Sequence, residues 1–477
     1  LDVTATSSNA RLGVVSGATG IAATATGDVT VRAITAGSLA GNLTLGLTSK
    51  ALSGSGLADG SLANGTVAVT GAAYDFATAA VASSLTLNNV RTGTLTNVSV
   101  GNTVTTSAAF QDSLDVAATS SIANLTLTNP ANIAAGAARN LVVNAATAGV
   151  LDATLTLALT SNANGVNGLN NAGLTAQTIA VTGAAYDLAR PTVATTLAIG
   201  NRRVGYAADL NIANSTLTSA TYQDSLDVTS ATSNAKLTLG SVANIAAGVD
   251  RNLVVTAATA GVLDATLTLG LTSNANGVAG LTNAALANRT VTVTGAAYDL
   301  ANASLDSSLV LGGVRVGSTA NLAVTNAVRT LAAYQDDLGV TATAGTTQLG
   351  IANPALISAG ATRNVVVTAA KAGLLTDTLT VSLTSKALTG TGLADGTATT
   401  QTVAVTGTAY DFAAATHAAN LALGNLRVNT AQRTLAVTNA LAANGTAAYQ
   451  DTLDVTATSS NARLGVVSGA TGIAATA

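Results

Sequence analysis

Hydrophobic residues alternate with small or polar residues along much of the chain. Leu155-Thr-Leu-Ala-Leu159 and Leu267-Thr-Leu-Gly-Leu271 place aliphatic side chains on one face and Thr, Ala or Gly on the other. A period of two is typical of a half-buried β-strand. Short apolar runs such as Thr178-Ile-Ala-Val-Thr182 add further strands, with Asn, Gly and Ser turns between them. We expect seven to nine short antiparallel strands in about 112 residues, which predicts a β-sandwich in an all-β protein.

Sequence landmarks return along the chain at a fixed interval. Val-Thr-Gly-(Ala/Thr)-Ala-Tyr-Asp occurs four times with evenly spaced tyrosines, and a lone arginine recurs at the same interval. A second landmark, (Phe/Tyr)-Gln-Asp, follows this spacing with a slightly longer last step. An interval of about 112 residues indicates tandem β-sandwich units. The landmark residues are Tyr74, Tyr186, Tyr298 and Tyr410, then Arg91, Arg203, Arg315 and Arg427, and in the second landmark Phe110, Tyr222, Tyr334 and Tyr449 with Asp112, Asp224, Asp336 and Asp451.

The two ends of the chain share one sequence. Residues 453–477 are identical to residues 1–25. Their offset equals four repeat units, of which the last is slightly longer than the others. We interpret the chain as a window from a longer protein in which a four-unit block recurs. The alternative is an added duplicate of the segment 1–25.

Unit boundaries are expected directly after the Tyr-Asp landmark, where the alternation loosens. Linkers of about six residues, not rich in Gly or Ser, should hold consecutive units closely. We therefore expect an extended rod, on the order of 140 Å long for four units. The predicted division is 1–78 for the C-terminal part of a repeat, 79–190, 191–302 and 303–414 for three β-sandwich repeats, and 415–477 for the N-terminal part of the next.

The composition narrows the possible classes of protein. Charged residues make up 9% and hydrophobic residues 48%, so the chain can bury a core built from Leu, Val, Ile and Ala. A net charge of -3 over 477 residues provides no basic stripe, so nucleic acid is not an expected partner. No apolar run approaches the 18 or so residues of a membrane span. We expect no membrane span in this window.

Catalytic chemistry has few candidate residues. The only histidine, His417, lies in a predicted linker, and the chain has no Cys, so neither general acid–base catalysis nor a zinc or redox-metal site is expected. The glycine-rich segments 53–60 and 389–396 lack the dinucleotide-binding spacing and are expected to be hairpin loops. We therefore expect no enzyme and no cofactor.

Calcium is the one metal that the sequence leaves open. Tandem β-domains can hold calcium through oxygen ligands at their junctions, and four aspartates recur beside the predicted linkers. Each landmark contains a single Asp, so the preferred hypothesis is that these carboxylates accept bonds from turn amides or pair with the periodic arginine. The weak calcium candidates are Asp75, Asp187, Asp299 and Asp411.

Two segments resemble a known family. Leu421-Ala-Leu-Gly-Asn-Leu-Arg-Val428, followed by Leu435-Ala-Val-Thr-Asn439, is similar to the opening strands of the choice-of-anchor D repeats, related to the ASPM-SPD-2-Hydin group. Residues 309–317 and 322–326 repeat the resemblance, although Leu replaces the aromatic residue that usually precedes the glycine. The resemblance implies immunoglobulin-like repeats of large bacterial surface proteins and no catalytic residue.

These observations favour a structural function. We expect the repeat region of a giant bacterial extracellular or cell-surface protein, which forms a fibre, stalk or filament by tandem and lateral packing of its units. Its expected partner is itself, with a surface glycan or a neighbouring cell, as in a biofilm, as a further possibility. The alternative is an adhesin whose repeats themselves bind glycan or a host surface. In that case exposed aromatics would gather in one place, whereas here they follow the repeat.

Overall fold

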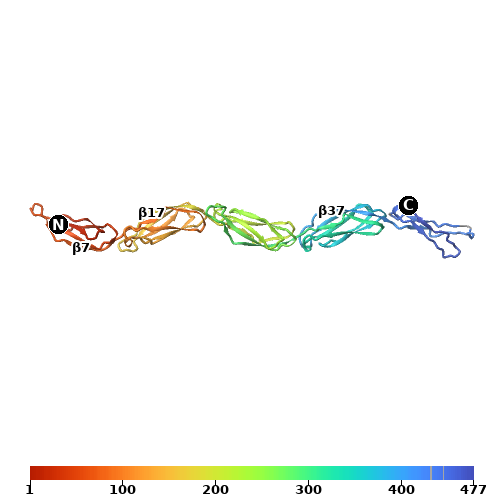
Figure 1. Cartoon of the computed structure of the whole chain (residues 1–477), viewed down its shortest axis with the longest axis horizontal. Helices are drawn as coiled ribbons and strands as arrows, with labels where there is room; N and C mark the ends of the chain where they lie inside the picture. The colour runs from red at the N-terminus through yellow and green to blue at the C-terminus, as the bar shows by residue number, and fades with distance from the viewer. Residues whose placement is uncertain (430–431, 444, 477) are drawn as a thin grey trace.

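The chain folds into β-sandwich units arranged in a row. The computed structural model describes residues 1–429, 432–443 and 445–476, and the units follow one another along a single extended rod (Figure 1). Its two ends lie at opposite ends of this rod. The alternation and the repeat predict tandem β-sandwiches in an all-β chain, and the structure confirms this arrangement; the sandwiches are immunoglobulin-like, as the family resemblance implies.

The first complete unit has two sheets. One has the order β10-β17-β16-β12, with β15 also paired to β17, and the other has the order β13-β14-β11-β9. The strands are β9 (Ala79–Val81), β10 (Ser84–Arg91), β11 (Leu95–Asn102), β12 (Ser113–Ser120), β13 (Leu125–Thr128), β14 (Ala138–Ala145), β15 (Gly149–Val150), β16 (Ala153–Asn162) and β17 (Ala172–Tyr186), with a 3-10 turn η1 (Ala108–Phe110).

The second complete unit repeats this topology and adds two short strands, β23 and β27. Its sheets have the orders β19-β28-β26-β21-β23 and β18-β20-β24-β22, and short β25 and β27 join β28 and β26. The elements are β18 (Pro191–Val193), β19 (Thr196–Arg203), β20 (Ala207–Asn214), η2 (Ala220–Tyr222), β21 (Ser225–Thr232), β22 (Leu237–Leu239), β23 (Val242–Ile245), β24 (Val249–Ala257), β25 (Gly261–Val262), β26 (Ala265–Asn274), β27 (Ala284–Ala285) and β28 (Arg289–Tyr298).

The third complete unit has the topology of the first. Its sheets have the orders β30-β37-β36-β32, with β35 on β37, and β29-β31-β34-β33. The elements are β29 (Ala303–Leu305), β30 (Ser308–Arg315), β31 (Thr319–Asn326), η3 (Ala332–Tyr334), β32 (Asp337–Ala344), β33 (Leu349–Ala352), β34 (Thr362–Ala369), β35 (Gly373–Leu374), β36 (Asp377–Lys386) and β37 (Thr399–Tyr410).

The two flanking segments contain parts of a unit. The first has β5 (Gly41–Ser49) at the centre of a small sheet, and the last has only short strands. The remaining elements are β1 (Asp2–Ser7), β2 (Leu12–Ser16), β3 (Thr30–Ala33), β4 (Gly37–Ser38), β6 (Gly60–Ser61), β7 (Gly65–Val69), β8 (Ala72–Ala73), β38 (Ala414–His417), β39 (Val437–Ala440), η4 (Ala447–Tyr449), β40 (Leu453–Val455) and β41 (Ala470–Ile473).

Each complete unit encloses its own aliphatic core. In the first, Leu155 and Leu157 of β16 face Leu141 and Val143 of β14, and all four are 0% exposed. Three such cores follow one another along the rod. Because Ala185 belongs to the first core and Ala189 to the second, only residues 186–188 lie between them.

One strand pair per complete unit departs from the expected antiparallel pattern. The first long strand pairs in parallel with the last: β10 with β17, β19 with β28 and β30 with β37. The expectation of antiparallel strands alone was wrong here because alternation gives the faces of a strand but not its direction. The close approach of β10 to β17 requires glycine in the first landmark, since a Cβ on Gly183 would lie 2.5 Å from the Asn88 carbonyl oxygen.

Candidate functional site

The residues of the two landmarks meet where one unit joins the next. The last strand β17 ends with Tyr186, and Asp187 follows it; the pair contacts Tyr222 and Asp224 at the start of the following unit. Asp187 N–H donates to the Tyr222 carbonyl at 2.9 Å, and Asp224 N–H donates to the Asp187 carbonyl at 3.0 Å. The two tyrosine rings lie 5.4 Å apart in an edge-on arrangement. The backbone of one unit is therefore bonded directly to the next.

The same backbone bonds form at all four junctions of the described chain. The first landmark Asp donates its N–H to the carbonyl of the aromatic residue in the second landmark, and its own carbonyl accepts from the second Asp. The paired rings have centroids 5.4 to 6.0 Å apart. The four pairs of aspartates are Asp75 with Asp112, Asp187 with Asp224, Asp299 with Asp336, and Asp411 with Asp451.

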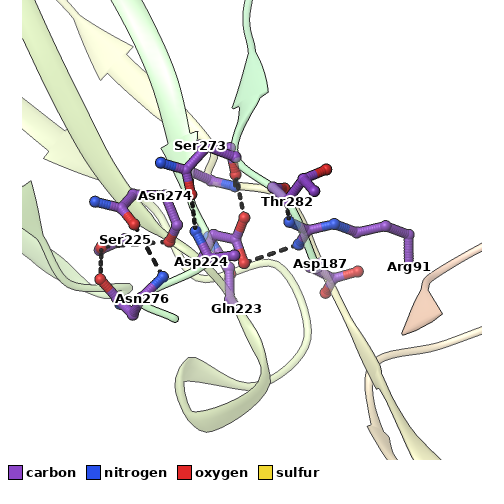
Figure 2. A network of polar contacts seen from close by, with 12 residues as sticks. Arg91, Asp187, Gln223, Asp224, Ser225, Ser273, Asn274, Asn276 and Thr282 are labelled. Carbon is purple, nitrogen blue, oxygen red and sulfur yellow. Dashed lines mark hydrogen bonds and ion pairs between the residues drawn. The ribbon is translucent and has the colours of Figure 1, made fainter. Parts of the chain in front are cut away.

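The periodic arginine crosses the junction. Arg91 lies at the end of β10, and its Nη1 donates to Asp224 Oδ1 at 2.8 Å while Nη2 donates to the Thr282 carbonyl at 2.9 Å (Figure 2). Thr282 belongs to the loop between β26 and β27 of the following unit. Asn89 Nδ2 donates to the Ala279 carbonyl of the same loop at 3.0 Å. One strand end thus contacts two separate elements of the next unit.

The next junction reproduces this geometry. Arg203 Nη1 lies 2.7 Å from Asp336 Oδ1, and its Nη2 donates to the Ala394 carbonyl at 2.7 Å. Asn201 Nδ2 donates to the Thr391 carbonyl at 3.0 Å. The Asp336 side chain is 0% exposed, so the carboxylate of this ion pair is removed from water.

The last of the four junctions, at Asp411 and Asp451, keeps the ion pair in a more open form. Arg315 Nη1 lies 2.6 Å from Asp451 Oδ2, and the two side chains are 42% and 37% exposed. The guanidinium also lies 4.5 Å from the centre of the Phe412 ring, a favourable cation–π contact.

A buried serine positions the aspartate that receives the arginine. Ser273 Oγ accepts the Ala189 N–H at 2.7 Å and donates to Asp224 Oδ2 at 2.7 Å (Figure 2). The Asp224 carboxylate therefore uses one oxygen for Ser273 and the other for Arg91. Ser273 therefore links Ala189, which follows the last strand of the preceding unit, to Asp224, which binds the arginine of that unit.

Two buried amides complete this network. Asn214 Nδ2 donates to the Asp224 and Ile245 carbonyls at 2.9 and 3.0 Å, and its Oδ1 accepts the Arg190 N–H at 2.8 Å. Gln223 Nε2 donates to Asn214 Oδ1 at 3.1 Å. Both residues are buried. Since buried polar groups are costly when unpaired, such a network favours a single arrangement of the linker.

Sequence reasoning did not identify these serine and asparagine positions. The serine recurs as Ser161, Ser273 and Ser385, and the asparagine as Asn102, Asn214, Asn326 and Asn439. Their recurrence at the repeat interval could have identified them from the sequence. In a chain so rich in Ser and Asn, however, a periodic Ser or Asn does not stand out as a periodic Arg does.

The four calcium candidates lie at the junctions between units. Asp187 Oδ1 accepts a bond from Thr92 Oγ1 at 2.9 Å. The other oxygen, Oδ2, is buried and has no hydrogen-bond partner in the described residues, as is also true of Asp75 and Asp299. No group of three or more acidic or histidine side chains able to hold a metal ion occurs in residues 1–429, 432–443 and 445–476.

The remaining candidate residues lie apart from the junction network. His417 is exposed at the end of β38, with Nδ1 3.0 Å from the Ala418 carbonyl oxygen. The two glycine-rich segments form loops in which Lys50 pairs with Asp59 and Lys386 with Asp395. No helix in the described part of the chain has the length and hydrophobicity needed to cross a bilayer.

The fold and the repeated junction define a tandem array of immunoglobulin-like β-sandwiches. No protein-family model matches the sequence, and no curated protein matches it. The chain is similar in structure to the human desmocollin-1 ectodomain, with 12% identity over 80% of this chain and 70% of that chain and a TM-score of 0.27. It is also similar to Drosophila N-cadherin EC1-4, with 9% identity over 85% and 92% of the chains and a TM-score of 0.26. Domains 4–9 of the surface layer protein SbsC share 14% identity over 85% of this chain and 57% of that chain, with a TM-score of 0.18. These likenesses are low, and the assignment of the fold rests on the sheets described above.

Proposed function

We propose that this chain is the structural repeat region of a large bacterial extracellular or cell-surface protein, where it acts as a fibre or stalk. One observation carries the proposal. At three successive junctions an arginine of one unit is paired with an aspartate of the next, beside the same pair of backbone hydrogen bonds. A repeated contact of this kind transmits position and force along the chain and needs no ligand.

The junction resists bending for a physical reason. Only residues 186–188 separate two cores, and they are fixed by backbone bonds, a ring pair and an ion pair. A hinge would have to break several of these together. The expected behaviour is that of a stiff rod, unlike a chain of domains on flexible linkers.

Composition and resemblance support the extracellular location. The chain has only 19 Lys and Arg residues and no Cys, Met or Trp. Few tryptic cleavage sites and few oxidisable side chains suit long exposure outside the cell. The resemblance of residues 421–428 and 435–439 to choice-of-anchor D repeats also favours a bacterial surface protein.

The outer faces of the units support lateral packing as well. On β26 and β28, the exposed Thr266, Thr268, Thr290 and Thr292 form an uncharged face, with Thr266 opposite Thr292 and Thr268 opposite Thr290. Such a face lacks the charges that normally keep sheets apart, and its short side chains lose little entropy on contact. Because it recurs along the rod, weak contacts between parallel rods can add up.

Small-angle X-ray scattering of the 477-residue chain tests the proposed stiff fibre. We expect a rod profile whose maximum dimension shortens when Arg91→Ala and Arg203→Ala are combined, because both junctions lose their ion pair. The matched control combines Arg139→Ala and Arg251→Ala, which remove exposed arginines, and should keep the wild-type profile. A compact particle for the wild-type chain would contradict the proposed function.

A further inference from the structure

Two junctions of the rod use loops of different sequence. The end of the first complete unit contacts the loop 275–283 of the second, and the end of the second contacts the loop 387–395 of the third. Six of the nine residues differ between these loops. A contact that depended on their side chains would therefore differ from one junction to the next.

The hydrogen bonds to the two loops nevertheless coincide. Arg91 Nη2 donates to the carbonyl 191 residues further along the chain at 2.9 Å, and Arg203 Nη2 spans the same interval at 2.7 Å. The asparagine two residues before each arginine donates to a carbonyl 190 residues further along, at 3.0 Å in both cases. A backbone carbonyl accepts a hydrogen bond whichever side chain its residue carries. Both arginines thus contact the backbone of the loop and not its side chains.

Both loops are closed by the same hydrogen bond. The Ala275 amide donates to Asn283 Oδ1 and the Ala387 amide donates to Asp395 Oδ1, at 3.0 Å each. Asn and Asp both provide an oxygen acceptor at this position, so the change from one to the other keeps the closure. The loops therefore begin and end in the same way although their middle residues differ.

A shared Gly-Leu pair lies between the two accepting carbonyls of each loop. Gly280 has φ +85° and Gly392 has φ +70°, in the left-handed region that glycine adopts without strain. The leucine after each glycine is half-buried. The accepting carbonyls belong to the residue before the glycine and to the residue after the leucine. This pair therefore accounts for the common position of the carbonyls.

The acceptor of the ion pair is also held in the same way in both units. Asp224 Oδ2 accepts from Ser273 and Asp336 Oδ2 accepts from Ser385, at 2.7 Å each. Each aspartate keeps its Oδ1 for the guanidinium of the preceding unit. The second and third complete units thus present the same acceptors, which are one carboxylate oxygen and two loop carbonyls.

The linkers make equivalent bonds as well. The Ala189 amide donates to Ser273 Oγ at 2.7 Å, and the Ala301 amide donates to Ser385 Oγ at 2.8 Å. The residue after each alanine donates through its backbone amide to the buried asparagine, at 2.8 and 2.9 Å. Because these donors are backbone amides, the linker of one junction can replace that of the other.

We propose that these junction surfaces are interchangeable: the end of the first complete unit also fits the third complete unit, from which the second unit separates it in the wild-type chain. In that arrangement Arg91 pairs with Asp336 and donates to the Ala394 carbonyl. Asn89 donates to the Thr391 carbonyl of the same loop. The partner that this surface accepts is therefore any unit with the landmark aspartate and a loop of the same length and path.

The interchange concerns the ends that carry Arg91 and Arg203. Arg315 has Gly313 in place of the asparagine, so the end of the third complete unit lacks one of the donors. A whole unit that carries either of the other two ends can be removed or added without a change in the junction contacts. This inference goes beyond the proposed function, because it requires neither an extracellular location nor lateral packing.

Deletion of residues 191–302 tests the proposal. These residues run from the first residue of β18 to the residue before β29, so the deletion places the third complete unit directly after the first. The Asp187 amide, which donates to the Tyr222 carbonyl in the wild-type chain, should then donate to the Tyr334 carbonyl. Hydrogen exchange followed by mass spectrometry should give a rate at Asp187 within about tenfold of the wild-type rate. A larger increase, with unchanged exchange at Leu155 in the core of the first unit, overturns the proposal.

A double-mutant cycle tests for the new ion pair itself. In the deletion variant, Arg91→Ala and Asp336→Asn should couple by roughly tenfold in the exchange rate at Asp187, because each removes one partner of the same pair. In the wild-type chain these residues belong to different junctions, so the same two substitutions should act independently. Independent effects in the deletion variant would mean that Arg91 does not reach Asp336, and would refute the interchange.

Loop replacement in the full chain tests the proposal even if the deletion variant does not fold. Residues 275–283 are replaced by the sequence of residues 387–395, which keeps the accepting carbonyls and the Gly-Leu pair. Hydrogen exchange at Asp187 should again stay within about tenfold of the wild-type rate. The control Gly280→Val places a branched side chain at φ +85° and should raise the rate by more than about tenfold. A comparable increase on loop replacement would show that loop side chains determine the contact, and overturns the proposal.

The outcome can be separated from that of the proposed function. A stiff rod in small-angle scattering, with fast exchange at Asp187 after deletion and after loop replacement, would support the fibre and refute the interchange. A chain that bends at its junctions but keeps slow exchange at Asp187 in both variants would contradict the stiff fibre and support the interchange.

Discussion

Arg91 and Asp224 are 133 residues apart in sequence and belong to consecutive units, yet Arg91 Nη1 lies 2.8 Å from Asp224 Oδ1. The Asp224 side chain is 1% exposed and the Arg91 side chain 24%. This pair therefore lies inside the contact between units and not on the free surface of either one.

Its position decides how much the pair contributes to stability. Exposed pairs such as Lys386–Asp395, at 42% and 47% exposure, contribute less than about 1 kcal/mol. Removing one partner of a buried pair costs about 3 to 5 kcal/mol, because the other charge stays desolvated. With a partly exposed arginine and a buried aspartate, we expect an intermediate cost of about 2 to 3 kcal/mol for each junction.

Substitution Arg91→Ala should loosen the first complete junction. Asp224 would keep its bond from Ser273 but lose the guanidinium, and the loop at Thr282 would lose a donor. Hydrogen exchange followed by mass spectrometry should then show faster exchange at the Asp187 and Asp224 amides, by roughly thirtyfold or more for a cost of about 2 kcal/mol.

The matched control for this experiment is Arg139→Ala, which removes an exposed arginine of β14. Arg139→Ala should leave hydrogen exchange at the junction amides unchanged. Neither Arg91→Ala nor Arg139→Ala should change exchange at the amides of Leu155 and Leu157 in the core. Unchanged exchange at Asp187 in Arg91→Ala would mean that the backbone bonds alone hold the units together.

Substitution Ser273→Ala should destabilise the second complete unit. It removes the acceptor of the Ala189 N–H and the donor to Asp224 Oδ2, both in buried surroundings. Two buried groups lose their partners at once, so we expect a loss of about 2 to 4 kcal/mol in the free energy of unfolding of this unit. Thermal unfolding by calorimetry should show one transition moved to lower temperature, while the exposed Ser241→Ala leaves every transition in place.

Much of the fold could be predicted from the sequence, because two independent patterns agree. The alternation in residues such as Leu155–Leu159 predicts strands, and the regular return of the landmarks predicts equivalent units. The direction of β10 could not be predicted. Its residues alternate equally well in a parallel or an antiparallel pair, and only its contact with β17 in three dimensions decides between them.

The junction could be predicted only in part. A chain with so few charges made the recurring Arg and Asp conspicuous, but the repeat makes all units equivalent. It therefore could not tell whether Arg91 pairs with Asp112 of its own unit or with Asp224 of the next. The roles of Asn214 and Ser273 depend on burial, which a residue type common on the surface does not reveal.

The loop that contains Asp395 should respond to acid in a defined direction. The hydrogen bond from the Lys386 ammonium, with a second bond from the Ala387 amide, lowers the pKa of Asp395 below its ordinary value of 3.8. A lowered pKa in the folded state means that the carboxylate stabilises the loop above pH 3.8 and that this contribution is lost as the pH falls through the lower value. Carbon NMR of the Asp395 carboxyl should give a midpoint below 3.8, and Lys386→Ala should raise it toward 3.8. A midpoint that Lys386→Ala does not move would show that the pair does not form in solution.

Calcium should have little effect on the stability of the rod. Calcium takes six to eight oxygen ligands, whereas Asp187 offers one buried oxygen without a partner in the described residues, and the neighbouring Asp224 already uses both of its oxygens for Ser273 and Arg91. We therefore expect the calorimetric transitions to stay in place when calcium is removed with a chelator or added in excess. A transition that moves to higher temperature with calcium would argue for a site at Asp187. In that case Asp187→Asn should abolish the shift while Asp306→Asn, an exposed carboxylate away from the junctions, retains it.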